Sequence, residues 1–586
     1  MDNLGVPAEP QIYVGTWTNW SHGKIFGATL TLTQTNGSFL VAFLALFVSF
    51  SGTSFFRISC FVLHHVLSSN KPSDALYHQT QAILRNSASG TTAFLSFFQL
   101  LWSQSESRNS RRPVTRVLPL LLHSAIIIGA FAVAGIYSSR ITSLTGDEVL
   151  IWSPVQGPVN FTNQTTDLET VTKVFGRYMS KRNNAFANYA QDCYTNANST
   201  PGNCKTFVKT HLPRTIDRNA SCPFDPRLCR SNYGNVRIDT GFLDSHWDLG
   251  INAPEPQRIR IRNVLHCSPL VTEGHVVYHN QSDDKLSIPY FSYYYGPIVQ
   301  DDNSIAFNET HVEMEQTIWQ DRVKRGLTEY PRYGLAYVCN PQSFTVAYHC
   351  RSRVSLPQNG SLERGQSSWR PIPGLFLNDS DVTIVFLSTG DMHYTAPVDD
   401  LWFSAHQQRL KSKSTHFIYE ADRAASPLGC AAQTQVCIRT QTNPSVCSQL
   451  GSMRDLGVLL SSNFTEVETN ITKAFFQFTD YLHIFLPIRS LGGEILDAKY
   501  SLNGFLQTPL PANQWQMEVE RWSSIILAAL QHSLVDYATG PSDERVSHIL
   551  LRPHNDQQRY IAQHQVSKAF LSRRHCFPRG KLYKTS

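Results

Sequence analysis

Two short polar stretches carry the residues best suited to chemistry, and the first is DSHWD at 244–248. It places Asp244, His246 and Asp248 at alternate positions. On a strand, alternate side chains face the same way, so these three could bind a metal ion or share a proton. On a loop they form a polar turn, and this alternative is the favoured one.

The second stretch is GDMHYTAPVDD at 390–400, which follows a predicted strand and offers His393, Asp399 and Asp400. Functional residues are often found on loops that follow strands. A turn with polar residues is again the favoured alternative.

A third group, Arg57, His64 and His65, follows the first apolar segment of the chain. Ionisable groups at membrane depth are costly, so these residues could form a proton or ligand path. The favoured alternative is contact with lipid headgroups.

Motifs that force a catalytic geometry are absent from the sequence. We find no phosphate-binding G-x-x-x-x-G-K-[ST] loop and no G-x-G-x-x-G turn before a helix. A G-x-S-x-G elbow and an H-E-x-x-H zinc motif are also missing. We therefore expect no cofactor, no metal and no catalytic residue. Whether the protein is an enzyme is left open, with a non-enzymatic role favoured.

Ten of the twelve cysteines fall between residues 193 and 447. An even number of cysteines in an oxidising compartment predicts disulfides, whereas a metal site would use tight CxxC or HxxxH spacings, which do not occur. The close pairs 193/204, 222/229, 339/350 and 430/437 suggest local bridges, although spacing leaves the connectivity open. Cys60 and Cys576 are left over. The disulfide candidates are Cys193, Cys204, Cys222, Cys229, Cys267, Cys339, Cys350, Cys430, Cys437 and Cys447.

Residues 141–480 carry ten Asn-x-Ser/Thr triplets, more than chance usage predicts, which favours a glycosylated surface in the secretory pathway. The predicted acceptors are Asn160, Asn163, Asn198, Asn219, Asn280, Asn308, Asn359, Asn378, Asn463 and Asn470.

Charge-free apolar stretches at 38–56 and 117–137 are each long enough to cross a bilayer core of roughly 30 Å. A third stretch, 88–103, is shorter. It either crosses the bilayer with a hydrophobic length slightly below the bilayer thickness, forms a re-entrant segment, or lies in the membrane interface. Arginines cluster just before residue 117, and the positive-inside rule therefore exports the chain after residue 137. If 88–103 spans, the N-terminus is cytosolic; otherwise the N-terminus is exported.

For the exported part, the sequence predicts a mixture of helices and strands. Apolar spacing predicts helices at 167–191 and 515–537, and the second is charged enough to be a packed or surface helix. Short runs rich in β-branched and aromatic residues predict strands at 344–350, 381–389 and 416–421.

Three segments carry a family resemblance: GTWTNWSHGKIFGATLTLT (15–33), DALYHQTQAILRN (74–86) and ANQWQMEVERWSSIILAALQHSLVDYATGP (512–541). They resemble a group of filamentous-fungal multi-pass membrane proteins of unknown function, over about residues 12 to 545. The resemblance implies helices clustered near the N-terminus and a large Cys-bearing exported domain. Some members are encoded beside secondary-metabolite genes. Members usually close with a further apolar span, which residues 550–586 lack.

The predicted fold class is α+β: N-terminal transmembrane helices followed by a large mixed α/β, disulfide-bonded exported domain. We expect a multi-pass protein of the plasma membrane or an endomembrane, with partners that are membrane lipid, N-glycans and an unidentified ligand or protein. Nucleic acid is not expected, because the net charge of +6 comes from a basic tail. The expected role is non-catalytic binding, sensing or export assistance, with a membrane-tethered lumenal enzyme acting on a metabolite or glycan as the alternative. The predicted parts are 1–37 (N-terminal segment), 38–140 (membrane region), 141–545 (exported domain) and 546–586 (basic, disordered tail).

Overall fold

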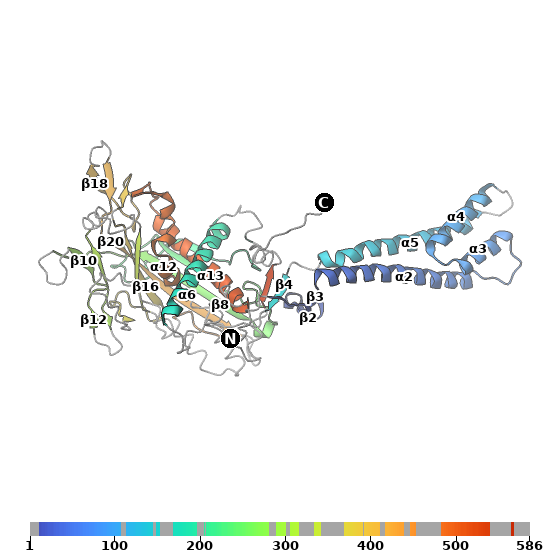
Figure 1. The fold of residues 1–586 in the computed structure, drawn as a ribbon, viewed down its shortest axis with the longest axis horizontal. Coiled ribbons are helices and arrows are strands. Elements are labelled where there is room, and N and C mark those ends of the chain that lie inside the picture. Colours follow the sequence, from blue (N-terminus) through green and yellow to red (C-terminus); the bar gives the residue numbers. More distant parts are fainter. Residues whose placement is uncertain are drawn as a thin grey trace, which may run out of the picture. The chain divides into compact units, whose positions relative to one another are not determined.

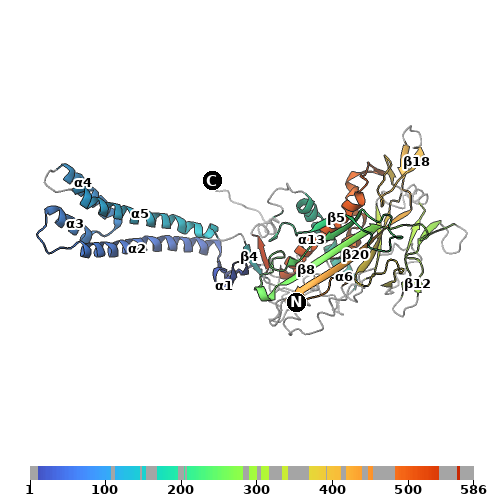
Figure 2. The same cartoon turned by 180° about the vertical axis from the view of Figure 1, so that it is seen from behind.

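The computed structural model divides the chain into two compact units (Figures 1 and 2). The helical unit comprises Val14–Trp17 and Thr29–Asp147, and the large unit comprises Met1–Tyr13, Thr18–Ala28 and Glu148–Ser586. The structure describes residues 11–106, 113–144, 148–152, 168–195, 204, 207–280, 289–299, 305–315, 333–340, 368–390, 392–410, 417–438, 446–452, 482–539 and 564–567.

The helical unit is built on two long helices that lie side by side, α2 (Gln34–Val66) and α5 (Pro113–Leu144) (Figures 1 and 2). The Thr33 side chain accepts from the Asn36 N–H and so caps the start of α2. Two shorter helices, α3 (Ala75–Asn86) and α4 (Gly90–Glu106), pack against them. The buried core of this unit consists of Phe56, Cys60, Leu76, Leu84, Ala93, Phe97, Leu100, Val117, Leu120 and Ile127.

Among the described residues, α2 and the part of α5 from Pro113 to Ser138 are long and apolar enough to cross a membrane. The predicted spans 38–56 and 117–137 lie inside these helices. The stretch 88–103 is helical too, but α4 has only 17 residues. Each long helix extends beyond its predicted span, because the helical hydrogen-bond pattern is not interrupted where the charge-free stretch ends.

An antiparallel sheet is the centre of the large unit, with strand order β14-β16-β20-β8-β6-β5. Two further short strands, β7 (Leu243–Asp244) and β21 (Val446–Cys447), pair with its long strands. The six ordered strands are β5 (Thr215–Ala220), β6 (Asn235–Asp239), β8 (Ile259–Pro269), β14 (Gly334–Asn340), β16 (Asp381–Ser388) and β20 (Ala425–Ile438).

Both faces of this sheet are buried, as the alternation along β16 makes plain. Val385 and Leu387 join the larger hydrophobic core, whereas Ile384 and Phe386 join a second core on the opposite face. Successive side chains of a strand point to opposite faces, so an almost continuous apolar run is what a strand covered on both sides requires. The predicted strand 381–389 is therefore confirmed.

Three helices of the large unit, α6 (Leu168–Ala190), α12 (Phe485–Leu491) and α13 (Gln514–Thr539), contribute to the larger core (Figure 1). The predicted helices 167–191 and 515–537 correspond to α6 and α13. Trp515, Val519 and Trp522 are buried as their spacing predicts, and α13 is a packed helix. The predicted strand 416–421 is β19, whereas the stretch 344–350 lies outside the described residues.

The remaining described elements are short. They are β1 (Gln11–Ile12), β2 (Gly15–Thr18), β3 (Ala28–Thr31), α1 (Gly23–Phe26), β4 (Glu148–Trp152), β9 (Val276–His279), β10 (Tyr290–Tyr293), β11 (Ile298–Val299), β12 (Ile305–Phe307), β13 (His311–Met314), β15 (Ser368–Trp369), β17 (His393–Tyr394), β18 (Gln407–Leu410), β19 (Phe417–Glu420), β22 (Leu502–Asn503), β23 (Leu506–Gln507) and β24 (His564–Ser567), with single 3-10 turns at Trp20–His22, Glu255–Gln257, Gly492–Ile495 and Ala498–Ser501 and a π turn at Gln191–Thr195.

Four disulfides join described cysteines: Cys193–Cys204, Cys222–Cys229, Cys267–Cys430 and Cys437–Cys447. Two of the local pairings suggested by spacing are confirmed. The suggested pairing of Cys430 with Cys437 is wrong, because Cys430 lies directly opposite Cys267 in the β8–β20 ladder and Cys437 lies opposite Cys447 on β21. Cys339 is also disulfide-bonded, and Cys60 is free and buried.

The N-terminal segment is part of the large unit at two places. Strand β1 pairs antiparallel with β4, with Gln11 opposite Trp152 and Ile12 opposite Ile151. Residues 18–28 belong to the same unit. The sequence had assigned residues 1–37 to a separate segment, because short strands of this kind carry no local signal of their distant partner.

Candidate functional site

The DSHWD stretch is a structural turn. Asp244 Oδ1 accepts from the backbone N–H groups of His246 (2.9 Å) and Trp247 (3.1 Å), and Asp248 Oδ2 accepts from the Asp244 N–H (2.7 Å). Both carboxylates therefore satisfy backbone donors of the turn itself. Among the described residues no group of three His, Cys, Asp or Glu side chains could hold a metal ion. The polar-turn alternative is confirmed.

His246 is fully buried, and its two ring nitrogens face different parts of the chain. Nδ1 lies 3.0 Å from the Ile251 carbonyl oxygen, and Nε2 lies 3.2 Å from the Ser21 hydroxyl. Buried polar groups of this kind hold a fold together through their hydrogen bonds. The imidazole therefore connects the turn to the N-terminal segment.

Two neighbours of this turn complete the attachment of the N-terminal segment. Asn252 Oδ1 accepts from the Trp20 N–H (3.1 Å), and Asn252 Nδ2 donates to the Thr18 carbonyl (2.8 Å). Arg258 Nη2 donates to the Trp20 carbonyl (3.3 Å), and its guanidinium lies 5.3 Å from the Trp247 ring centroid. The Asn252 side-chain amide thus donates to one backbone group of the N-terminal segment and accepts from another, which is the hydrogen-bond pattern that a neighbouring strand provides.

The GDMHYTAPVDD stretch sends its ionisable residues to three separate environments. His393 on β17 has Nδ1 3.8 Å from Glu420 Oε1. Asp399 is 83% exposed and lies 3.0 Å from His406 Nε2. Asp400 is fully buried. The structure therefore does not bring these three residues together in one site.

His406 lies between two carboxylates, Asp399 and Asp422, with Nδ1 2.8 Å from Asp422 Oδ2. The hydrogen bonds to both aspartates raise the pKa of His406, because they favour the imidazolium form. This exposed triad connects a turn after β17 with the turn before β20.

A buried cluster at the start of α13 was missed by the sequence analysis. Asp400 accepts from the backbone N–H groups of Trp402 (2.8 Å), Phe403 (2.9 Å) and Trp515 (2.8 Å). Burial raises the pKa of Asp400 to about 6. The sequence analysis named Asp400 as a candidate after a predicted strand, but the sequence carries no local signal of its burial or of its contact with Trp515.

Glu518 is the second carboxyl of this cluster. It accepts from the N–H groups of Asp497 (2.6 Å) and Ala498 (2.9 Å) and from Gln514 Nε2 (2.8 Å). Burial raises its pKa to about 7. Shifted pKa values often mark functional sites, but they also arise in structural networks. Here each carboxylate satisfies backbone donors from separate segments, which makes both carboxyls structural.

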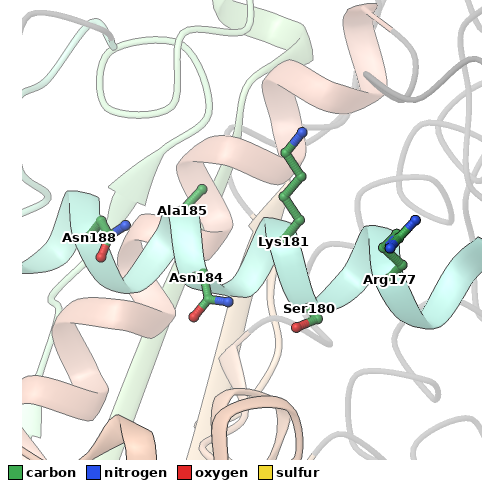
Figure 3. A pocket seen from close by; sticks show the side chains of 6 residues that line it. All are labelled: Arg177, Ser180, Lys181, Asn184, Ala185 and Asn188. Atoms are coloured by element: carbon green, nitrogen blue, oxygen red, sulfur yellow. The ribbon is translucent and has the colours of Figure 1, made fainter.

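An open depression of about 500 Å³ lies along one side of α6 (Figure 3). All of its described lining comes from this one helix, at positions three or four residues apart that share a face. Its lining has two cationic and three polar side chains, all exposed. The lining residues are Arg177, Ser180, Lys181, Asn184, Ala185 and Asn188.

Comparison with protein-family models, curated proteins and solved structures gives no match to this chain.

Four predicted glycan acceptors are described, and all four are exposed: Asn219, Asn280, Asn308 and Asn378. Asn378 lies in a turn just before β16. The other six, Asn160, Asn163, Asn198, Asn359, Asn463 and Asn470, lie outside the described residues.

The group after the first apolar segment contributes to helix packing. The helix α2 continues through Arg57, whose Nε donates to the Ala88 carbonyl (3.0 Å), and His64 Nδ1 contacts Gln81 Oε1 on α3. These contacts link α2 with α3 and with the start of α4. A path built from Arg57, His64 and His65 gains no support from them.

Proposed function

We propose that this chain is an integral membrane protein in which α2 and α5 cross the bilayer and hold the large unit on its exported side. The large unit would then be a glycosylated, disulfide-bonded domain with a non-catalytic role in binding, sensing or export. The observation that carries the proposal is that the chain leaves the large unit after Ala28, passes through the helical unit and returns to the large unit at Glu148, the start of β4.

This return has a consequence for topology. Strand β1 pairs with β4, so the chain on either side of the helical unit lies in one compartment. The number of crossings between them would therefore be even, and among the described residues α2 and α5 are the two helices with sufficient length and apolarity. Of the two topologies open from the sequence, this supports an exported N-terminus.

Charge supports the same orientation. Residues 57–116 contain seven Lys or Arg and only two acidic residues, Asp74 and Glu106. Arg116 pairs with Asp74 across 2.6 Å, which joins the start of α5 to the N-cap of α3. The positive-inside rule assigns such a segment to the cytosol. With two crossings, α4 lies at the cytosolic side, where it re-enters or follows the interface.

The surfaces of both long helices suit lipid. On α2, Phe39, Leu46 and Phe50 are largely exposed, and on α5 the same holds for Ile126 and Ile136. At 1.5 Å per residue, a helix of 33 residues is about 50 Å long, which exceeds the roughly 30 Å hydrocarbon core. The excess length leaves room for a helical turn or more outside the hydrocarbon at either end.

Disulfides and exposed acceptor sites suit the secretory pathway, where thiols are oxidised and glycans are added. We place the protein at the plasma membrane or an endomembrane. Following the family resemblance, we further propose a fungal protein that assists secondary metabolism, with an unidentified ligand or protein partner. The α6 depression is the described surface that suits such a ligand.

Cysteine accessibility tests the topology. A membrane-impermeant maleimide should label Asn70→Cys, in the turn between α2 and α3, only after the membrane is permeabilised. Tyr233→Cys, which is exposed on the large unit, should be labelled on the exported face of intact cells or vesicles. An N-terminal epitope tag should be accessible on the same side as position 233. Tag and position 233 on opposite sides would refute the hairpin.

A further inference from the structure

The most exposed large apolar side chains in the described structure lie on the short helix α1. Ile25 is 82% exposed and Phe26 is 89% exposed. They are consecutive and follow Lys24, which is exposed as well. Burial of a large apolar side chain stabilises a protein, and these two side chains, which remain in water, do not contribute that stabilisation. A surface of this kind indicates a partner.

The loop that carries them, residues 19–27, is closed by its own backbone. The Asn19 N–H donates to the Gly27 carbonyl (2.7 Å), and the Gly27 N–H donates to the Gly23 carbonyl (3.0 Å). Gly23 turns the chain at a φ of 75°. A Cβ on Gly27 would lie 2.0 Å from the Asn19 carbonyl oxygen, so only glycine fits there. This closure leaves Ile25 and Phe26 on the outside of the loop.

The loop is also held by the large unit. Ser21 contacts His246, and the backbone of Trp20 is hydrogen-bonded to Asn252 and Arg258. These contacts fix one side of the loop against the DSHWD turn. The two apolar side chains are therefore presented on a fixed support.

The chain itself limits how far this loop can lie from α2. Seven residues lie between Phe26 and Gln34, the first residue of α2, so the two are eight residue steps and at most about 26 Å apart even when the chain is fully extended. If α2 crosses the bilayer, the exported headgroup layer is within reach of the loop. Aromatic and apolar side chains beside a lysine are the composition of segments that lie in this layer.

We propose that the loop of residues 19–27 inserts Ile25 and Phe26 into the exported-side leaflet as an interfacial anchor, which holds the large unit close to the lipid surface. The inference rests on the proposed function, because it requires α2 to cross the membrane. Lipid is the partner we propose for Ile25 and Phe26, because the short connection to α2 keeps the bilayer within reach of the loop.

Fluorescence quenching by nitroxide lipids tests this proposal. Single cysteines replace Phe26, Leu46 or Tyr233 in the full-length chain carrying Cys60→Ser, and each is labelled with an environment-sensitive dye. The labelled proteins are placed in phosphatidylcholine nanodiscs with the nitroxide either near the headgroup or near the bilayer centre. The parent without an added cysteine, labelled in parallel, gives the background. Retention of the disulfides in each variant shows that the large unit has folded.

We expect the dye at position 26 to lose most emission with the shallow nitroxide, and the dye at position 46 with the deep one. The dye at position 233 should keep its emission with both. If position 46 is quenched but position 26 behaves like position 233, the anchor is refuted and the membrane hairpin stands. If position 46 is not quenched by either lipid, the proposed function itself fails.

Discussion

Loss of the Cys267–Cys430 disulfide is predicted to destabilise the large unit far more than loss of Cys222–Cys229. The first bridge closes a loop of 163 residues, and the second a loop of only 7. A cross-link stabilises mainly by restricting the unfolded chain, and the restriction grows with the logarithm of loop length. The two bridges therefore form a matched pair within one unit.

The loop-entropy relation gives about 5 kcal/mol for the long loop and about 2.4 kcal/mol for the short one at 25 °C, a difference of about 2.8 kcal/mol. Loss of two sulfur atoms from the core increases the difference, because Cys267 and Cys430 are buried whereas Cys222 is partly exposed. The ladder between β8 and β20 extends well beyond the bridge on one side, so the strands should stay paired in the variant.

The test compares Cys267→Ala/Cys430→Ala with Cys222→Ala/Cys229→Ala in the full-length protein in detergent. Unfolding in guanidinium chloride, followed by a short protease pulse, reports the folded fraction at each denaturant concentration. Equal losses of unfolding free energy in the two double variants, or a larger loss for the 222/229 pair, would refute the loop-length reasoning.

Four further predictions follow from the structure. The raised pKa of Asp400 means that the folded state binds its proton more tightly than the unfolded chain, so this group should lower stability by about 3 kcal/mol as pH rises from about 4 to about 7. Denaturation across this range should show that dependence flattened in Asp400→Asn and retained in Asp399→Asn. Asn252→Ala should release the N-terminal segment, seen as faster proteolysis between residues 13 and 34 with the rest of the large unit intact, whereas uniform proteolysis would contradict the role of Asn252. Asn378→Gln should increase electrophoretic mobility by one glycan, and glycosidase treatment should abolish the difference. Deletion of the gene should remove a metabolite or accumulate an intermediate in cell and medium extracts, and the intermediate's structure distinguishes an export role from an enzyme; unchanged profiles would count against the link to secondary metabolism.

Local sequence determined the long helices of this protein. The apolar residues of α6 and α13 lie three or four positions apart, so their spacing predicts a helix without any knowledge of the fold. The helices α2 and α5 were predicted from uninterrupted charge-free stretches. The strand β16 was predicted from its short run of β-branched and aromatic residues, which is also what burial on both faces requires.

The tertiary structure decided the pairing of distant segments. Cys430 bonds with Cys267, 163 residues away, because β8 and β20 are neighbours in one register, and spacing along the chain contains no trace of that choice. The role of His246 depends on Ser21, which is 225 residues distant. The residue types at 244–248 suggested metal chemistry, yet the two aspartates accept from backbone N–H groups of the turn and His246 contacts Ser21 and a backbone carbonyl.

The buried carboxyls of Asp400 and Glu518 illustrate the same limit. An acidic residue is expected on the surface, and only the arrival of backbone N–H groups from other segments makes its burial tolerable. The proposal of an even number of membrane crossings also rests on a long-range pairing, that of β1 with β4. Sequence specifies what each segment can form, because periodicity and turn chemistry act over a few residues. Which segments meet, and what their polar groups do there, depends on contacts that only the folded chain brings together.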